Sequence, residues 1–370
     1  MSARFLTVVL ERAFNMRDGF GREIDYMRIS VIDSCNLNCY YCNPCDNNEH
    51  CHALNILSVK EVLCIVRAAT RLGIKHFRLT GGEPLLHPQI DEMVSQIKKI
   101  PGVRSVSLTT NAVLLAQHAK WLKEAGIDSI NVSLDTIDAS EYERITKKPL
   151  LEEVKHGINA AIECGIRVKI NVVLTPQTDV VALTRYVAKK GTDIRFIEMM
   201  PVGEGHTNGV EPYKKVIGTL SKLYGEPCRI NTEKTKEINS GNDKRKIPDN
   251  GPAEYYIFPE LGIRVGLIQA IHGKFCDTCN RIRVTADGRL MPCLGSSVTM
   301  DLVPDSWDFA DDAEKDFSIV RALRAAIKAK PGCHNFNDNA VTYTKTTETK
   351  TTEIEAAEVN AARNMSRIGG

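Results

Sequence analysis

The sequence predicts an α/β protein built on a partial (β/α)6 TIM-like barrel, followed by a C-terminal α+β extension. Short β-branched apolar runs alternate with segments of helical apolar spacing over residues 27–200, a pattern typical of βαβ units and a parallel sheet. Six such runs are present, fewer than the eight strands that close a barrel. After residue 205 the alternation ends and polar residues dominate, which indicates a different kind of structure.

The six runs are predicted as the strands of the sheet. They cover residues 27–32, 75–79, 104–108, 128–134, 168–174 and 194–199. Helical spacing marks residues 58–72 and 113–125, and Gly73 and Gly126 follow these segments as helix terminators. A curved, open barrel fits the count of strands, and a flat doubly wound sheet is the alternative arrangement.

Polar and glycine residues follow several of the predicted strands, at residues 80–84, 109–111, 135–136 and 200–203. Because functional residues of parallel α/β proteins lie at the carboxyl ends of the strands, we expect a site at that edge of the sheet. Beyond it, one helix is predicted near residues 213–223, and strands over residues 262–268 and 282–285.

Composition excludes several classes of protein. The chain has 370 residues, of which 43% are apolar and 25% charged, with a net charge of +2. These values are ordinary for a soluble globular protein and indicate neither a nucleic-acid partner nor a membrane surface. No apolar run is long enough for a transmembrane helix. The N-terminus lacks the long apolar core of a secretory signal, so we expect a cytoplasmic protein.

Twelve cysteines are many for a cytoplasmic chain of this size. A reducing compartment disfavours disulfides, so metal ligation or redox chemistry is the better interpretation. Two groups stand out: Cys35, Cys39 and Cys42, with Cys45 and Cys51 close behind, and then Cys276, Cys279 and Cys293. Four cysteines are isolated and are predicted to be small buried apolar side chains: Cys64, Cys164, Cys228 and Cys333.

The first group forms a C-x3-C-x2-C loop directly after the first predicted strand. Structural zinc requires four ligands, and a four-iron cluster has four corners. Three thiolates on such a cluster leave one iron open to bind another molecule. Cys45 is available as the fourth ligand of a zinc site or of a closed electron-transfer cluster, but the spacing after a first β-strand favours the open cluster.

This loop resembles the signature of the radical S-adenosylmethionine superfamily. The resemblance implies that the open iron binds the amino and carboxylate groups of S-adenosylmethionine, and that an electron from the cluster then gives a 5′-deoxyadenosyl radical. Residues 81–84, Gly-Gly-Glu-Pro, resemble the glycine-rich strand end of the family, where the backbone can approach the methionine moiety. The cofactor-contacting positions of the family fall on Tyr41, Gly82, Ser133 and Met200.

The second group has the spacing Cys276-x2-Cys279-x13-Cys293 and again offers three thiols. A zinc site with His272 as fourth ligand is one interpretation. A second open cluster is favoured, because Arg281 and Arg283 project from the same face of the following strand and carry forked donors suited to phosphate.

Together these features resemble the GTP 3′,8-cyclase family, which begins molybdenum cofactor biosynthesis. The similarity runs from residue 20 to the C-terminal Gly369-Gly370. It implies a lyase that holds two [4Fe-4S] clusters and S-adenosyl-L-methionine and converts GTP to (8S)-3′,8-cyclo-7,8-dihydroguanosine 5′-triphosphate. In this family GTP lies between the clusters, the radical removes the ribose 3′ hydrogen, and the carbon radical attacks C8 of guanine. No residue is identified as a general acid or base.

The resemblance also implies a substrate site and partners. The substrate-binding positions fall on Arg28, Arg78, Thr109, Lys169, Arg195, Arg281, Ile282, Arg283, Gly369 and Gly370. The expected partners are GTP, an electron donor and a downstream cyclic pyranopterin monophosphate synthase, with no nucleic acid and no membrane, in a monomer or homodimer. Ser34 and His76 depart from the family, which usually has arginine and lysine at these positions.

The predicted organisation has four parts: a radical S-adenosylmethionine core over residues 20–205, a C-terminal domain with the second cluster over residues 206–336, a Thr/Lys/Glu-rich segment over residues 337–363 and a tail over residues 364–370. The third part has too few large apolar residues to form a core. Two other functions stay open: a radical enzyme that modifies peptides and holds an auxiliary cluster, and a zinc-stabilised binding protein.

Overall fold

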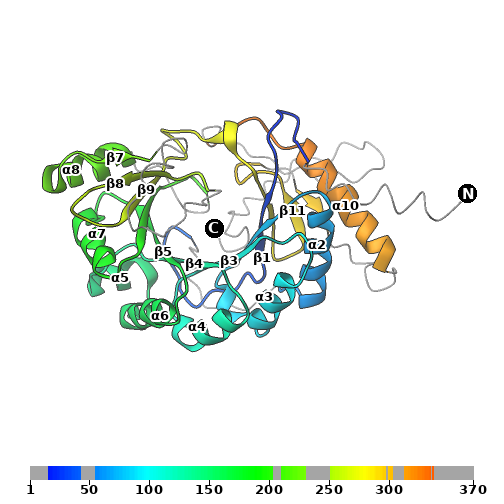
Figure 1. Cartoon of the computed structure of the whole chain (residues 1–370), viewed down its shortest axis with the longest axis horizontal. Coiled ribbons are helices and arrows are strands. Elements are labelled where there is room, and N and C mark those ends of the chain that lie inside the picture. The colour runs from blue at the N-terminus through cyan, green and yellow to red at the C-terminus, as the bar shows by residue number, and fades with distance from the viewer. Residues whose placement is uncertain are drawn as a thin grey trace, which may run out of the picture.

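The structure, a computed structural model, describes residues 16–42, 55–202, 210–230, 251–296, 299–302, 312–334 and 336. Within these residues the strands form one sheet in the order β12-β11-β10-β1-β2-β3-β4-β5-β6-β9-β8-β7. The sheet curves around a central space, and the helices lie on its outer side (Figure 1). The prediction of an α/β partial barrel is confirmed, and the flat alternative, which needs helices on both faces, is not what forms.

Each strand predicted over residues 27–199 is present, shifted by no more than a few residues. They are β1 (Tyr26–Ser30), β2 (His76–Thr80), β3 (Ser105–Thr110), β4 (Ser129–Ser133), β5 (Val168–Leu174) and β6 (Asp193–Glu198). All pair in parallel with their neighbours in sequence. Because side chains alternate along a strand, Met27 and Ile29 are fully buried against the helices while Arg28 faces the interior.

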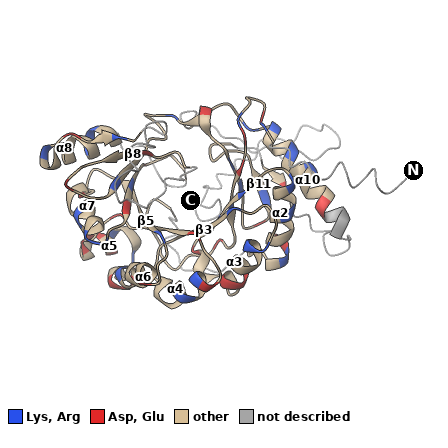
Figure 2. Cartoon of the chain, in the orientation of Figure 1, with Lys and Arg blue, Asp and Glu red and all other residues tan. Residues whose placement is uncertain are grey.

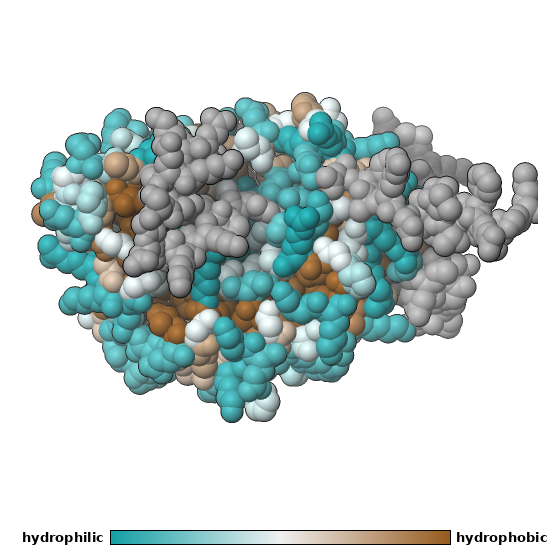
Figure 3. All heavy atoms as spheres, in the orientation of Figure 1, coloured by the Kyte–Doolittle hydropathy of each residue, from teal (hydrophilic) through white to brown (hydrophobic). Residues whose placement is uncertain are grey.

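The outer layer consists of helices that follow the strands. They are α2 (Val59–Arg71), α3 (Ile90–Lys98), α4 (Leu115–Glu124), α5 (Ala139–Thr146), α6 (Leu151–Glu163) and α7 (Val180–Lys189). Ser58 and Glu61 form a capping box that starts α2. Gly73 and Gly126 have φ of +88°, so they terminate the helices as predicted. In Figure 3 apolar residues show on the inner side of a hydrophilic rim.

Residues after 205 complete the sheet at both edges. β9 (Arg264–Ile268) pairs in parallel with β6, and β10 (Arg281–Val284) pairs in parallel with β1. Four antiparallel strands extend the ends: β7 (Cys228–Arg229), β8 (Glu254–Ile257), β11 (Arg289–Met291) and β12 (Met300–Asp301). The two C-terminal strands expected from the sequence therefore exist, but they join the barrel sheet itself. Apolar pattern alone does not show which sheet edge a strand will meet.

Five further helical elements complete the described fold, and one of them is a 3-10 turn (Cys276–Thr278) at the start of the second cysteine group. A π-helical turn (Tyr213–Ile217) continues into α8 (Gly218–Tyr224), where the sequence predicts a helix, and a 3-10 turn (Pro84–Leu86) follows β2. The helix α10 (Asp312–Lys328) was not predicted. It lies beside α2 in the outer layer (Figure 1), and Arg71 of α2 pairs with Asp316 of α10 at 2.7 Å. No helix in the described part of the chain is long and apolar enough to cross a membrane.

The isolated cysteines differ from expectation. Cys64 is buried and Cys164 is partly buried, but Cys228 and Cys333 are exposed. For these two the prediction of a buried side chain is wrong, because Cys228 lies on the edge strand β7 and Cys333 lies in the turn after α10. Cys45, Cys51 and the segment 337–363 lie outside the described residues.

Candidate active site

A cavity of about 340 Å³ occupies the interior of the barrel. Strands β1 to β6, β9 and β10 contribute to its wall, together with both cysteine groups. All six cysteines predicted as cluster ligands line it: Cys35, Cys39, Cys42, Cys276, Cys279 and Cys293. The fold therefore brings the two groups, which lie far apart in the sequence, to one space.

The first cysteine loop is anchored on the end of α5. The backbone N–H of Asn38 donates to the carbonyl of Thr146 at 3.0 Å, and that of Tyr40 donates to the carbonyl of Ile145 at 3.1 Å. These two bonds fix the loop on either side of Cys39, so its thiol is presented to the cavity by main-chain contacts.

The glycines after β2 hold the start of the same loop. The N–H of Gly82 donates to Ile32 O at 2.7 Å, and the N–H of Glu83 donates to Ser34 O at 2.8 Å. A Cβ atom on Gly82 would lie 2.2 Å from Ser34 O, which is inside any allowed contact. The sequence explains this glycine by approach to the methionine moiety; the structure adds that the backbone of the cysteine loop itself needs the space.

Glu83 is a buried carboxylate that joins the ends of β2 and β3. Its Oε1 accepts from the Leu85 N–H at 3.0 Å and from Thr110 Oγ1 at 2.7 Å, and its Oε2 accepts from the Asn111 N–H at 2.7 Å. Burial raises the pKa of Glu83 to about 7, although these hydrogen bonds oppose the shift. Asn111 in turn places its Nδ2 3.8 Å from Cys35 Sγ, so Glu83 supports a predicted cluster ligand.

Tyr41 is fixed at the opposite side of the loop. Its hydroxyl donates to Asp135 Oδ2, while the N–H of Val173 donates to Asp135 Oδ1 at 2.8 Å. Burial raises the pKa of Asp135 to about 6 and raises the pKa of Tyr41 well above its usual value. Ser133 and Met200 line the same cavity, as does Gly82, so the four residues matched to cofactor contacts are brought together.

Four arginines meet on neighbouring strands. Arg28 on β1 lies opposite Arg283 on β10 and opposite Arg78 on β2, and Arg281 lies two residues before Arg283. Burial, then Arg283, Arg78 and Arg281, holds the pKa of Arg28 well below its usual value. Burial and Arg281 lower the pKa of Arg283 to about 10. Such a concentration of like charge suits a polyanionic ligand.

Thr109 and Arg195, which are also predicted substrate contacts, face the cavity as well. Arg78 donates through Nε to the Tyr26 hydroxyl and places Nη1 3.4 Å from Thr109 Oγ1. Arg195 is 4% exposed and donates through Nε to Asn171 Oδ1 at 2.9 Å, so it is an interior residue and not a surface charge. Figure 2 shows basic residues on strands around the centre and charges of both signs on the outer helices.

Two predicted substrate residues do not line the cavity. Lys169 lies on β5 two residues before Asn171, with its Nζ 5.9 Å from the centre of the Tyr255 ring. Ile282 is fully buried in the core, because strand alternation turns it away from the face that carries Arg281 and Arg283. Gly369 and Gly370 lie outside the described residues.

Several polar cavity residues were missed from the sequence, among them two asparagines and a lysine. Asn131 and Asn171 project inward from β4 and β5, and an amide within an apolar strand pattern was the signal available for both. Lys330, which follows α10, also lines the cavity. No motif surrounds it, so the sequence offered no signal for this lysine.

His272 does not complete a zinc site. Its Nδ1 shares a hydrogen bond with Glu198 Oε1, and Glu198 Oε2 accepts from the backbone N–H of Ile271 at 2.7 Å. Among the described side chains, no three His, Cys, Asp or Glu residues are gathered closely enough to hold a single metal ion. Three thiols on each of two loops are instead the donor type and number of a four-iron cluster with one open corner, so the residues present fit two such clusters.

Comparison with known proteins agrees with the site. Residues 29–182 match the radical SAM superfamily, and residues 192–336 match the family described as Molybdenum Cofactor Synthesis C. The chain is 36% identical over 324 residues to a GTP 3′,8-cyclase of Clostridium perfringens, covering 87% of this chain and 95% of that protein. It is 35% identical over 331 residues to a GTP 3′,8-cyclase of Petrotoga mobilis, covering 88% and 96%.

Solved structures with a similar fold have low sequence identity to this chain. SuiB of Streptococcus suis, bound to the precursor peptide SuiA, has a TM-score of 0.52 and 16% identity, covering 79% of this chain and 62% of that one. Native anSMEcpe with bound AdoMet has a TM-score of 0.50 and 17% identity, covering 82% and 84%. At these identities the likeness shows the fold alone.

Proposed function

The chain belongs to the GTP 3′,8-cyclase family of the radical S-adenosylmethionine superfamily, and from this we propose that it converts GTP to (8S)-3′,8-cyclo-7,8-dihydroguanosine 5′-triphosphate. This reaction is the first step of molybdenum cofactor biosynthesis. The observation that supports it best is the cavity in which two sets of three cysteines flank a group of four arginines.

Two [4Fe-4S] clusters and S-adenosyl-L-methionine are the cofactors. We assign the first cluster to Cys35, Cys39 and Cys42, and the second to Cys276, Cys279 and Cys293. When bound, the first cluster and S-adenosyl-L-methionine supply a 5′-deoxyadenosyl radical. We assign the contacts to S-adenosyl-L-methionine to four residues of the cavity: Tyr41, Gly82, Ser133 and Met200.

The arginines are assigned to the triphosphate. Burial, and after it the charge of the neighbouring arginines, lowers the pKa of Arg28 and of Arg283. The four guanidiniums of Arg28, Arg78, Arg281 and Arg283 therefore repel one another in the folded chain. A bound triphosphate removes that repulsion and accepts forked, charge-assisted hydrogen bonds. GTP binding is therefore expected to stabilise the fold and to depend on salt.

The remaining predicted substrate contacts are supported to different degrees. Thr109 and Arg195 line the cavity beside the four arginines. Lys169 lies on the same face of β5 but outside the cavity wall, and Ile282 turns its side chain to the core, so only its backbone is available to a ligand. Gly369 and Gly370 are carried over from the family resemblance alone.

The protein positions the reacting groups and excludes water. The Tyr41–Asp135 hydrogen bond fixes the aromatic ring beside Cys42, and the strand ends set the depth of the cavity. The ribose of GTP must lie between the two cysteine groups, with its 3′ carbon toward the first. No step is assigned to a general acid or base of the described cavity.

We further propose the cellular setting. An electron donor must reduce the first cluster, and a cyclic pyranopterin monophosphate synthase must consume the product. Reduced thiols are needed for both clusters, and the described cysteines form no disulfide with one another, which supports a cytoplasmic location. The protein is a monomer or homodimer, with a core over residues 20–205, a second part over residues 206–336 and a tail after the segment 337–363.

An anaerobic assay tests the reaction. Reconstituted protein is incubated with dithionite and S-adenosylmethionine, with or without GTP, and both nucleosides are followed by mass spectrometry. We expect 5′-deoxyadenosine together with a product isomeric with GTP. Cys35→Ala and Cys276→Ala should abolish the product, whereas Cys228→Ala, which removes an exposed thiol outside the cavity, should leave it unchanged.

The alternatives predict other results. Slow 5′-deoxyadenosine formation at the same rate with and without GTP, and intact GTP, would support a radical enzyme that acts on a peptide. A protein that binds zinc and shows no iron absorption after reconstitution would be the zinc-stabilised binding protein.

A further inference from the structure

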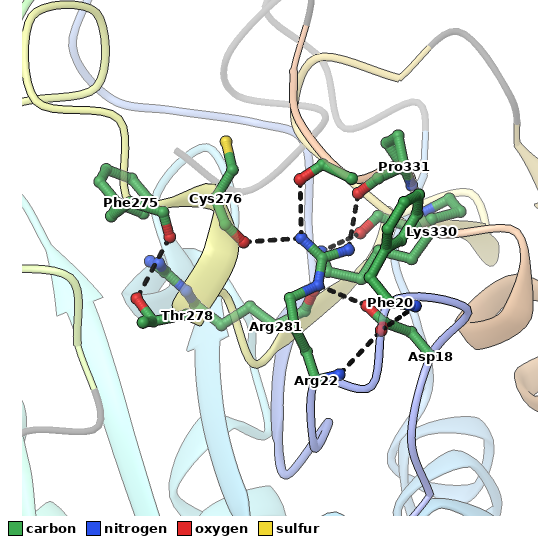
Figure 4. Close-up of polar contacts among 11 residues, drawn as sticks. Asp18, Phe20, Arg22, Phe275, Cys276, Thr278, Arg281, Lys330 and Pro331 are labelled. Atoms are coloured by element: carbon green, nitrogen blue, oxygen red, sulfur yellow. Dashed lines mark hydrogen bonds and ion pairs between the residues drawn. The ribbon is translucent and has the colours of Figure 1, made fainter.

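Lys330 is a buried cation beside the second cysteine group. Lys330 lies two residues after the end of α10 and is 2% exposed. Its Nζ donates to Arg281 O and to Pro292 O, both at 2.8 Å. Figure 4 shows Lys330 and Arg281 close to the loop that carries Cys276.

The two carbonyls stand next to predicted cluster ligands in the chain. Arg281 is two residues after Cys279, and Pro292 immediately precedes Cys293. One ammonium group therefore ties together the backbone at two of the three cysteines.

A second buried cation, Arg22, differs from Lys330 in that it has a carboxylate partner. Its guanidinium donates to Cys276 O at 2.6 Å and to Pro331 O at 2.6 Å (Figure 4). However, Arg22 is paired with the buried carboxylate of Asp18 at 2.6 Å, so this group is close to neutral overall. Among the described residues, no carboxylate forms an ion pair with Lys330, and its Nζ donates to two backbone carbonyls.

A cluster bound by three thiolates is negatively charged and gains one more negative charge when it is reduced. Net charge and hydrogen bonds near the sulfurs set the reduction potentials of such clusters. In a buried site, an ammonium without a carboxylate partner interacts strongly with that added charge. We propose that Lys330 is a positioning residue for the second cluster, which fixes the backbone beside Cys279 and Cys293 and raises the reduction potential of the cluster.

The inference rests on the second cluster of the proposed function, so the test isolates that cluster. The parent is the full chain with Cys35, Cys39 and Cys42 replaced by alanine, reconstituted with iron and sulfide. Lys330→Met removes charge and donors, Lys330→Gln keeps donors, and Lys330→Arg keeps charge. Lys328→Met removes an exposed lysine at the end of α10, two residues before Lys330, and is the matched control.

The measurements are iron content, circular dichroism and a redox titration with dithionite followed by electron paramagnetic resonance. Dithionite transfers one electron to the cluster, and no protein bond is made or broken. We expect Lys330→Met to lower the equilibrium constant for reduction of the cluster at least tenfold. For a one-electron couple this is a shift of about 59 mV to more negative potential. Lys330→Gln should shift similarly, Lys330→Arg should stay near the parent, and Lys328→Met should match it.

Cluster loss is also informative. If Lys330→Met folds but holds less iron, while Lys330→Arg holds as much as the parent, the positioning role is supported. If both variants lose iron equally, the lysine acts by shape alone and the charge-based inference is wrong.

Three other results would overturn it. If Lys330→Met has the same reduction potential and the same iron content as the parent, Lys330 does not tune the second cluster. The proposed function would be unaffected by that result. If the reduction potential of Lys330→Met is unchanged but the same substitution raises the KM for GTP in the chain that keeps all cysteines, Lys330 is a substrate contact instead. A parent that binds no iron at residues 276–293 would remove the second cluster itself, and the proposed function would fail with it.

Discussion

At the scale of single residues, Gly82 shows how strongly backbone packing limits the site. The Gly82 N–H bonds to Ile32 O, and a Cβ atom there would lie 2.2 Å from Ser34 O and 2.6 Å from Asp33 O. The obstacle is main chain, which cannot move aside as a flexible side chain can. Any larger residue must therefore displace the start of the first cysteine loop.

We predict that Gly82→Ala loses the first cluster and keeps the second. Iron should fall from about eight to about four per chain, and 5′-deoxyadenosine formation should be lost. The control is Gly218→Ala, because Gly218 has open space where a Cβ would stand and begins α8, where alanine is favoured by up to about 1 kcal/mol. Full iron content in Gly82→Ala would show that the loop tolerates the shift.

Glu83 gives the site a pH dependence of stability. Burial raises its pKa to about 7 in the folded chain, above the value near 4.3 of an unfolded glutamate. The folded state thus binds the proton more tightly, and its stabilisation is complete below about pH 4 and lost as pH rises to about 7. The whole shift corresponds to roughly 4 kcal/mol, of which roughly 3 kcal/mol falls between pH 4.5 and 8.

The prediction is that Glu83→Gln removes this slope. Unfolding of the metal-free protein in urea, measured between pH 4.5 and 8, should show wild-type stability falling relative to the variant by roughly 3 kcal/mol. The glutamine also loses the bond from Asn111, which adds a constant offset, so the slope and not the offset is decisive. Parallel curves for the two proteins would contradict the raised pKa.

At the scale of elements, the second cysteine loop depends on segments distant in sequence. Arg22, in the segment before β1, binds the carbonyls of Cys276, Pro331 and Gly332 and pairs with Asp18 (Figure 4). The start of the chain, the loop after β9 and the segment after α10 therefore meet at one guanidinium. The side chains of Arg22 and Asp18 are 7% and 0% exposed.

We predict unequal effects for two ion pairs of similar length. Arg22→Met should cost about 3–5 kcal/mol of stability, because it leaves the Asp18 carboxylate buried without its partner. Arg71→Met should cost about 0–1 kcal/mol, because that pair joins α2 and α10 at the surface, with the arginine side chain 52% exposed.

Urea unfolding of the two metal-free variants measures this difference. Iron analysis should also show partial loss of the second cluster in Arg22→Met only. Equal stability of the two variants would mean that Arg22 does not hold the loop.

At the scale of the whole molecule, the residues after 205 are part of the barrel sheet. β9 covers the edge of β6, and β10 covers the edge of β1. Without them, the parallel strands β1 to β6 would expose two unpaired edges and an open interior. Exposed edges of this kind promote aggregation, so the core over residues 20–205 should not be an independent unit.

A fragment of residues 1–205 tests this prediction. We expect it to aggregate in size-exclusion chromatography and to show no cooperative thermal transition in circular dichroism, whereas the full chain shows one. A monomeric fragment with a sharp transition would indicate that the core folds alone and that the C-terminal strands only dock on it.

The sequence by itself determined the local features of this protein. Strand and helix periodicity gave the six central strands and the partial barrel, and the spacing of Cys35, Cys39 and Cys42 predicted a set of cluster ligands. Both are encoded by neighbours in the chain, where alternation of side chains and the reach of one loop set the geometry. Arg281 and Arg283 were found for the same reason, since they share one strand face.

Only the tertiary structure decided which distant segments meet. It placed β10 beside β1, so that Arg283, Arg28 and Arg78 form one row, and it turned Ile282 into the core. It also brought Lys330 to the second cysteine group and exposed Cys228 on an edge strand. Pairing between strands depends on hydrogen bonds and burial across the whole sheet, and no short stretch of sequence carries that information.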